Sequence, residues 1–218
     1  MPVQGLLETA STVIRRAPFA GGHTLEAHGG YLIRIESFRR LELGRLVREA
    51  LASEGLSGRL PGLHVSVIRR RKVVRLAFAG PQAPSAGASW YVAHEVLPQR
   101  LSRAANATVH AYLYEPSSKE EVIAYGNGRR VGGDRVVYDE VDLPVPMEEM
   151  DDAAFAHMRS RWPLGHLAYV FGLKREELLG LPRASASAVL ALDASDVEAQ
   201  LEALLPSPQV PVLTFDAA

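Results

Sequence analysis

The stretch LHVSVIRRRKVVRLAF, residues 63–78, contains the clearest local structure in the chain. Two runs rich in β-branched and apolar residues flank the polar turn RRRK, a pattern that predicts a β-hairpin with a basic tip. Before it, GYLIRIE at residues 30–36 alternates apolar and polar side chains, which predicts a strand. Apolar residues then recur with helical spacing from residue 38 to Gly55, so we expect a helix between that strand and the hairpin.

After the hairpin, residues 90–105 predict a second helix, in which Pro98 should cause a kink or a break. TVHAYLYE at residues 108–115 predicts a further strand. The order strand, helix, strand, strand, helix, strand is that of split βαβ sheets. The predicted fold class is therefore α+β, with a ferredoxin-like βαββαβ-type antiparallel sheet followed by a mainly helical C-terminal region.

The next segment, residues 116–143, fits either a hairpin that turns at Asn127-Gly128 or a short helix that ends at Gly126. We favour the hairpin because its second arm is rich in valine and tyrosine, which are strand-forming residues.

A proline-containing acidic stretch at residues 144–152 marks a boundary along the chain. It divides the protein into a sheet domain, residues 1–143, and a helical C-terminal region, residues 144–218, either separate from the sheet domain or packed on it as one unit. Within the second region, residues 187–193 predict one last strand.

The composition excludes several classes of protein. The chain has 218 residues and no cysteine, which excludes a disulfide scaffold, a zinc site with cysteine ligands, an iron–sulfur cluster and a thiol nucleophile. No apolar run approaches the roughly 18–20 residues that span a bilayer, and the first residues lack the pattern of a secretion signal. We therefore expect a soluble cytoplasmic protein that needs no cofactor and does not associate with membranes.

The net charge of −1 hides opposite charges in the two parts of the chain. Residues 1–105 contain 15 basic and 7 acidic residues, whereas residues 106–218 contain 9 basic and 18 acidic residues. Two parts of opposite sign can attract each other within one chain or pair between chains, so self-association is an option. Simple solvation of both charged faces is the alternative, because exposed ion pairs contribute little.

The acidic residues around the boundary form the first candidate site. Acidic surfaces suit a basic protein partner and need no catalytic geometry, and the chain shows no signature of a common enzyme class. We therefore favour a non-catalytic protein-interaction module, such as a regulator, an adaptor or an immunity-type inhibitor, over an enzyme. The candidate partner-binding residues, here called the acidic set, are Asp139, Glu140, Asp142, Glu148, Glu149, Asp151 and Asp152.

The basic hairpin tip is the alternative site, because arginine-rich hairpins can bind nucleic-acid phosphates. Its candidate residues, here called the basic set, are Arg69, Arg70, Arg71, Lys72 and Arg75. Residues 164–181 have the apolar spacing of a helix-turn-helix, but their second helix would be too short to cross several bases. Because the neighbouring strands offer only Phe78 for base stacking, we rank nucleic acid below protein as the partner.

A small metal-dependent hydrolase or transferase is the second alternative. His23, Glu26 and His28 lie in a glycine-flanked stretch, and two histidines with one carboxylate are enough to bind a catalytic divalent ion. Their spacing matches no known metal motif.

Overall fold

The computed structural model describes residues 28–38, 42–53, 63–78, 87–115, 118–142, 149–179, 186–190 and 197–204. Within these segments, no helix combines the length and the apolar character needed to cross a lipid bilayer.

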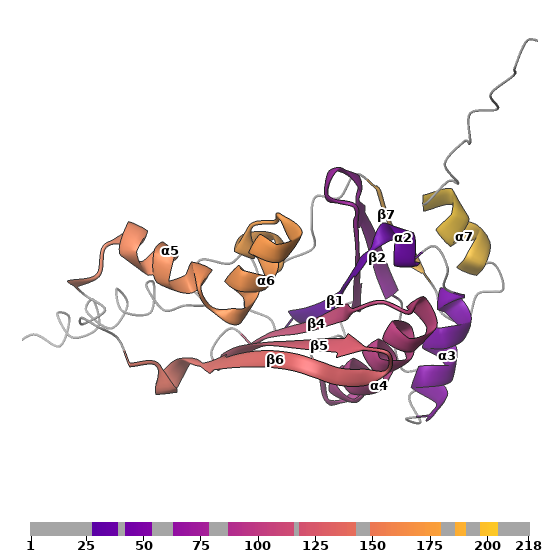
Figure 1. The fold of residues 1–218 in the computed structure, drawn as a ribbon, viewed down its shortest axis with the longest axis horizontal. Helices are drawn as coiled ribbons and strands as arrows, with labels where there is room; N and C mark the ends of the chain where they lie inside the picture. Colours follow the sequence, from indigo (N-terminus) through magenta and orange to yellow (C-terminus); the bar gives the residue numbers. More distant parts are fainter. Residues whose placement is uncertain are drawn as a thin grey trace, which may run out of the picture.

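One antiparallel sheet organises the described residues (Figure 1). Its strands are β1 (His28–Arg34), β2 (Leu63–Ile68), β3 (Val73–Phe78), β4 (Val109–Glu115), β5 (Lys119–Gly126), β6 (Arg129–Val137) and β7 (Ala186–Leu190). Their order across the sheet is β6-β5-β4-β1-β3-β2-β7, and every neighbouring pair is antiparallel. The predicted α+β class with an antiparallel sheet is confirmed, and the predicted hairpin is the β2–β3 pair.

Helices connect and follow the strands. They are α2 (Ile35–Phe38), α3 (Leu43–Ser53), α4 (Gly87–Ala105), α5 (Asp152–Ser160), α6 (Pro163–Phe171) and α7 (Val197–Leu204), with 3₁₀ turns η1 (Arg69–Arg71), η2 (Tyr138–Glu140) and η4 (Arg175–Glu177). The predicted break at Pro98 is wrong, because α4 runs through it. Leu97 and Leu101 on either side of Pro98 are fully buried, and their packing outweighs the hydrogen bond that proline removes.

The β5–β6 pair confirms the predicted second hairpin and excludes the short helix. Asn127 and Gly128 connect the two strands, and both have positive φ angles, 50° and 74°. Two such residues form the type I′ turn whose twist matches that of antiparallel strands, and glycine adopts it without steric strain. The predicted last strand is also present as β7, which pairs with β2. The C-terminal region therefore adds a strand to the sheet of the first region.

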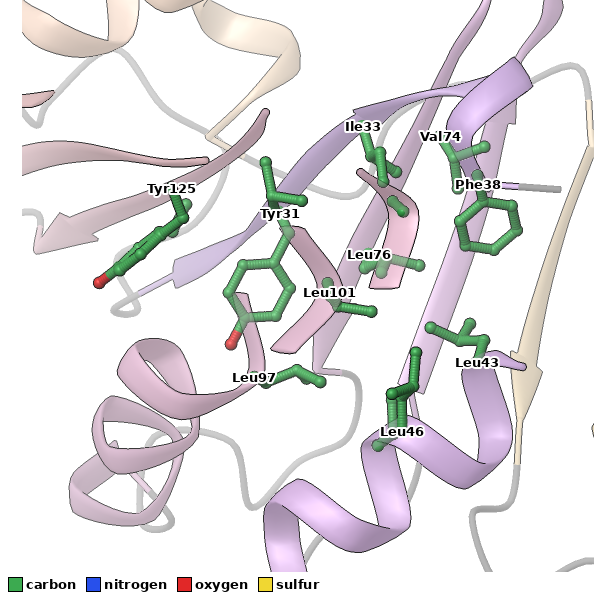
Figure 2. Packing of buried hydrophobic residues seen from close by; sticks show 14 of the residues in the cluster. Tyr31, Ile33, Phe38, Leu43, Leu46, Val74, Leu76, Leu97, Leu101 and Tyr125 are labelled. Carbon is green, nitrogen blue, oxygen red and sulfur yellow. The ribbon is translucent and has the colours of Figure 1, made fainter. Parts of the chain in front are cut away.

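The main hydrophobic core lies between one face of the sheet and the helices α3 and α4 (Figure 2). Alternate residues of the central strands point into it, as expected for a sheet, and the helices contribute a matching apolar stripe. Its members include Tyr31, Ile33, Phe38, Leu43, Leu46, Val74, Leu76, Leu97, Leu101 and Tyr125.

A second core covers the opposite face of the sheet. There, Leu32, Tyr112 and Tyr114 pack against α6 and against the residues that follow it. The members from the C-terminal region are Leu164, Leu167, Ala168, Phe171, Leu178 and Leu179. Helix α6 ends at Gly172, whose φ of 65° is the left-handed conformation of a helix C-cap. Both faces of the sheet are therefore covered, and the second cover comes from residues 163–179.

Candidate functional site

The described members of the acidic set lie at the surface. Asp139, Glu140, Asp142, Glu149, Asp151 and Asp152 are all exposed, whereas Glu148 lies outside the described residues. None of the six forms a salt bridge with another described residue. Asp151 also has a local role, because it is the N-cap of α5 and accepts a hydrogen bond from the Ala154 N–H at 2.7 Å. The other described carboxylates are directed to solvent.

The acidic set lies near both ends of α5 rather than in one cluster. Tyr138 begins η2 and stacks on Trp162, with ring centroids 5.4 Å apart. Trp162 directly precedes α6, so η2 with Asp139 lies beside the α5–α6 junction. Asp152 is at the opposite end of α5, about 12 Å along the helix axis. A partner surface that contacts both the carboxylates of η2 and those at the start of α5 therefore has to extend along α5.

The basic set is divided between the surface and the interior. Arg70, Arg71 and Lys72 are exposed at the tip of the β2–β3 hairpin, while the side chain of Arg69 lies outside the described residues. The guanidinium of Arg71 lies against Gly172, the C-cap of α6, where its charge complements the negative end of the helix dipole. Arg71 therefore has a structural contact as well as an exposed charge.

Arg75, in contrast, is fully buried and is not part of the surface of the tip. Its Nε donates to the hydroxyl of Tyr112, its Nη1 to the carbonyl of Glu177 at 2.9 Å, and its Nη2 to the carbonyl of Leu178 at 3.1 Å. Three hydrogen bonds from one planar guanidinium fix the end of η4 to the sheet. The function of Arg75 in this structure is to connect the C-terminal region to β3.

The predicted metal site lies largely outside the described residues. His23 and Glu26 are not described, and His28 is described only as the first residue of β1. Within the described ranges, no three histidine, cysteine, aspartate or glutamate residues lie close enough to hold a metal ion. The metal hypothesis therefore stays a prediction.

A buried polar centre, which the sequence did not indicate, lies beneath α6. We define it as Tyr114, Glu120, Tyr138, Arg159 and Arg175, which come from β4, β5, η2, α5 and η4. Glu120 Oε2 and Arg175 Nη2 are 2.6 Å apart, and their side chains are 0% and 5% exposed. The Arg175 guanidinium is also 5.9 Å from the centre of the Tyr114 ring. Five separate elements thus meet around one buried ion pair.

Glu120 belongs to this centre because of the alternation along β5. Its neighbour Glu121 points to the other face, whereas Glu120 points toward α6, where the backbone of Leu164 favours the charged form of its carboxylate. That backbone lies in the first turn of α6, where the N-cap residue Trp162 provides no side-chain hydrogen bond. Glu120 therefore places its negative charge near the first turn of α6, the positive end of the helix dipole.

Burial changes the protonation equilibria in the polar centre. Burial raises the pKa of Glu120, and the opposite charge of Arg175 partly lowers it again. Burial likewise raises the pKa of Tyr138 and of Tyr114. The pKa of Arg159 is lowered by burial and then by the like charge of Arg175. The two arginines therefore repel each other, while the carboxylates of Glu176 and Glu120 both favour the charged form of Arg159.

The hydrogen bonds of this centre are incomplete. Six buried side-chain atoms have no hydrogen-bond partner among the described residues, and five of them belong to the polar centre. These five are Glu120 Oε1, Tyr138 Oη, Arg159 Nε, Arg175 Nε and Arg175 Nη1. Buried polar groups in native proteins are nearly always satisfied, so such a concentration calls for water or a ligand.

A groove between α5, α6 and η4 reaches the edge of this centre. It has a volume of about 670 Å³, and its polar and aromatic lining includes Arg161, His166, Tyr169, Lys174, Arg175 and Glu176. The side chain of Tyr169 is 81% exposed. The lining contains more cations than anions, so the groove suits a negatively charged group.

Comparison with known proteins gives no relative: no family model, no curated protein and no solved structure matches this chain. The fold and the site define an α+β protein whose single sheet is covered on both faces by helices. What this protein does has to be inferred from its own residues.

Proposed function

We propose that the chain is a non-catalytic protein-interaction module, acting as a regulator, an adaptor or an immunity-type inhibitor. Its partner is a protein with a basic surface that contacts the carboxylates along α5. One observation supports this most directly: six exposed carboxylates of the acidic set lack a salt bridge to any described residue. Carboxylates that stay solvated in the free protein are available to complement a basic partner and to accelerate its encounter.

The dimensions of this region fit a protein partner. A stable interface covers about 800 Å² on each side, which is enough to reach both ends of α5. The neighbouring helix α6 exposes Tyr169 and Val170, at 81% and 50%. Tyrosine is enriched at interfaces, where it supplies apolar contact inside a polar rim. A contact of this size would therefore combine the charges near α5 with the apolar surface of α6.

We also propose that β1 to β4 form a ferredoxin-like unit. Two observations support it: these strands follow the order β4-β1-β3-β2, and all their pairings are antiparallel. The helices between β1 and β2 and between β3 and β4 complete the split βαβ order. In this proposal, β5, β6 and β7 extend the unit at its two edges.

The test of partner binding compares two double variants that remove the same number of charges. Asp139→Asn/Glu140→Gln alters the acidic set, and Glu36→Gln/Glu95→Gln removes two exposed carboxylates elsewhere. Proteins captured from native lysate are identified by mass spectrometry, and the affinity for each is then measured at increasing salt. The first variant should weaken binding and reduce its salt dependence, whereas the second should leave both unchanged. Equal affinities for the two variants would contradict the proposal.

Nucleic-acid binding at the hairpin tip is the second candidate function. Arg34, Arg70, Arg71 and Lys72 are exposed, and none of them pairs with a described carboxylate. However, α6 covers the sheet face that would otherwise stack on bases, and Arg75 is buried. Retention of the protein on a heparin column at low salt, lost in Arg70→Ala/Lys72→Ala, would support this function. Flow-through of the unmodified protein would exclude it.

A further inference from the structure

The polar centre contains more cationic than anionic side chains, and the Glu176 carboxylate outside it also favours the charged form of Arg159. The centre contains two guanidinium groups and one carboxylate, and that carboxylate binds only Nη2 of Arg175. The remaining nitrogens of Arg175, Nε and Nη1, make no well-formed hydrogen bond with the described residues, although the side chain is 95% buried. The Tyr138 hydroxyl, which also lacks a well-formed partner, lies beside this guanidinium. Nε of Arg159 likewise makes no well-formed hydrogen bond. Three buried cationic donors therefore lack a well-formed hydrogen bond to the described part of the chain.

The groove leads to these donors, because Arg175 is itself one of its lining residues. Arg161 and Lys174 lie at its exposed rim, and neither forms a salt bridge with a described carboxylate. Glu176 is the one acidic residue in the lining. A negatively charged group that enters the groove therefore meets cations at the rim and a buried guanidinium further in.

We infer that the groove between α5, α6 and η4 binds a small oxyanion, the phosphoryl or carboxylate group of a small molecule, through Arg175, with Arg161 and Lys174 at its rim. Guanidinium groups bind both kinds of oxyanion through paired, charge-assisted hydrogen bonds. The groove volume of about 670 Å³ is in the range of small-molecule sites. Tyr169 at its edge offers an aromatic face to the rest of such a molecule. This site differs from the acidic set and does not depend on the proposed protein partner.

The direct test observes the Arg175 side chain by NMR in the full chain labelled with nitrogen-15. Inorganic phosphate and acetate are titrated separately, and sodium chloride at the same ionic strength serves as the control. We expect the Nε–H signal of Arg175 to shift and to saturate with one of the two oxyanions, while those of Arg129 and Arg135 on β6 stay unchanged. The oxyanion that saturates identifies the ligand chemistry. Shifts that never saturate, or that chloride reproduces, would overturn the inference and assign the donors to water.

Rim variants make the test independent of the buried ion pair, whose loss can unfold the protein. Arg161→Ala/Lys174→Ala removes two exposed cations at the groove, and Arg129→Ala/Arg135→Ala removes two exposed cations on β6. The groove variant should weaken oxyanion binding roughly fivefold, and the β6 variant should not change it. Equal dissociation constants for the two variants would show that binding takes place elsewhere and would refute the site.

Discussion

Replacing Arg175 by methionine should lower the free energy of unfolding by about 3–5 kcal/mol near neutral pH. The variant leaves the carboxylate of Glu120 fully buried without the guanidinium that now lies 2.6 Å away. Replacing both residues, as Glu120→Leu/Arg175→Met, should cost only about 1 kcal/mol, because two apolar side chains need no counter-ion. The remaining loss in the double variant is the favourable interaction between the Glu120 carboxylate and the Leu164 backbone at the start of α6.

The pH dependence of the Arg175→Met variant has a definite sign. Burial already raises the pKa of Glu120 in the folded protein, and removing Arg175 takes away the charge that opposes this rise. A carboxyl whose folded pKa exceeds its unfolded value stabilises the fold most below the unfolded pKa, and this contribution is lost as pH rises through the folded pKa. The destabilisation should therefore be smallest in acid and grow toward neutral pH, whereas Glu120→Leu/Arg175→Met should not show this growth.

Urea unfolding of the four proteins at several pH values measures these quantities as a double-mutant cycle. The exposed pair of Arg45 and Glu42 serves as the control cycle, because its side chains are 54% and 68% exposed. Its coupling should be far smaller than that of the buried pair. The reasoning is refuted if the two cycles give the same coupling, or if the destabilisation by Arg175→Met does not change with pH.

Three further outcomes follow from individual contacts. Arg75→Lys keeps the charge, but a lysine cannot reach Tyr112 and two carbonyls together, so the free energy of unfolding in urea should fall by about 2–4 kcal/mol. An unchanged free energy of unfolding would contradict the buried network. Gly128→Ala places a Cβ at a φ of 74°, which should destabilise the folded protein by about 1–2 kcal/mol and lower its melting temperature. An unchanged melting temperature would argue against the type I′ turn. Burial and the charge of Arg34 lower the pKa of His110, so Arg34→Ala should raise that pKa in an NMR titration. No change in the titration would exclude the contribution of Arg34.

The hairpins were predictable because their signals are local. Val73 and Val74 belong to a strand-forming run, and Asn127-Gly128 is a turn with one favoured geometry, so the structure agrees with the sequence at both places. Pro98 was misjudged because local propensity takes no account of the core that holds α4 together. Local sequence patterns predict least well those elements that are stabilised by packing between residues far apart in the chain.

The polar centre and Arg75 illustrate the same limit. Arg75 alternates with Val74 and Leu76, and such a pattern normally places a charged residue in solvent. Its acceptors at residues 177 and 178 are 102 and 103 positions away, so nothing in the local sequence indicates them. The burial of Glu120 is equally hard to predict, because a glutamate near the start of a strand normally indicates an exposed polar position. The exposed members of the acidic set needed no distant partner, and their surface position was predictable.

The pairing of β7 with β2 has a consequence for synthesis of the protein on the ribosome. Ser66 and Ser187 face each other in this pair but stand 121 positions apart in the chain. A nascent polypeptide therefore displays one edge of β2 to solvent, or to a chaperone, until β7 has been synthesised. An open strand edge recruits other strands, so interrupted translation products that lack residues 186–190 should aggregate where the finished polypeptide does not.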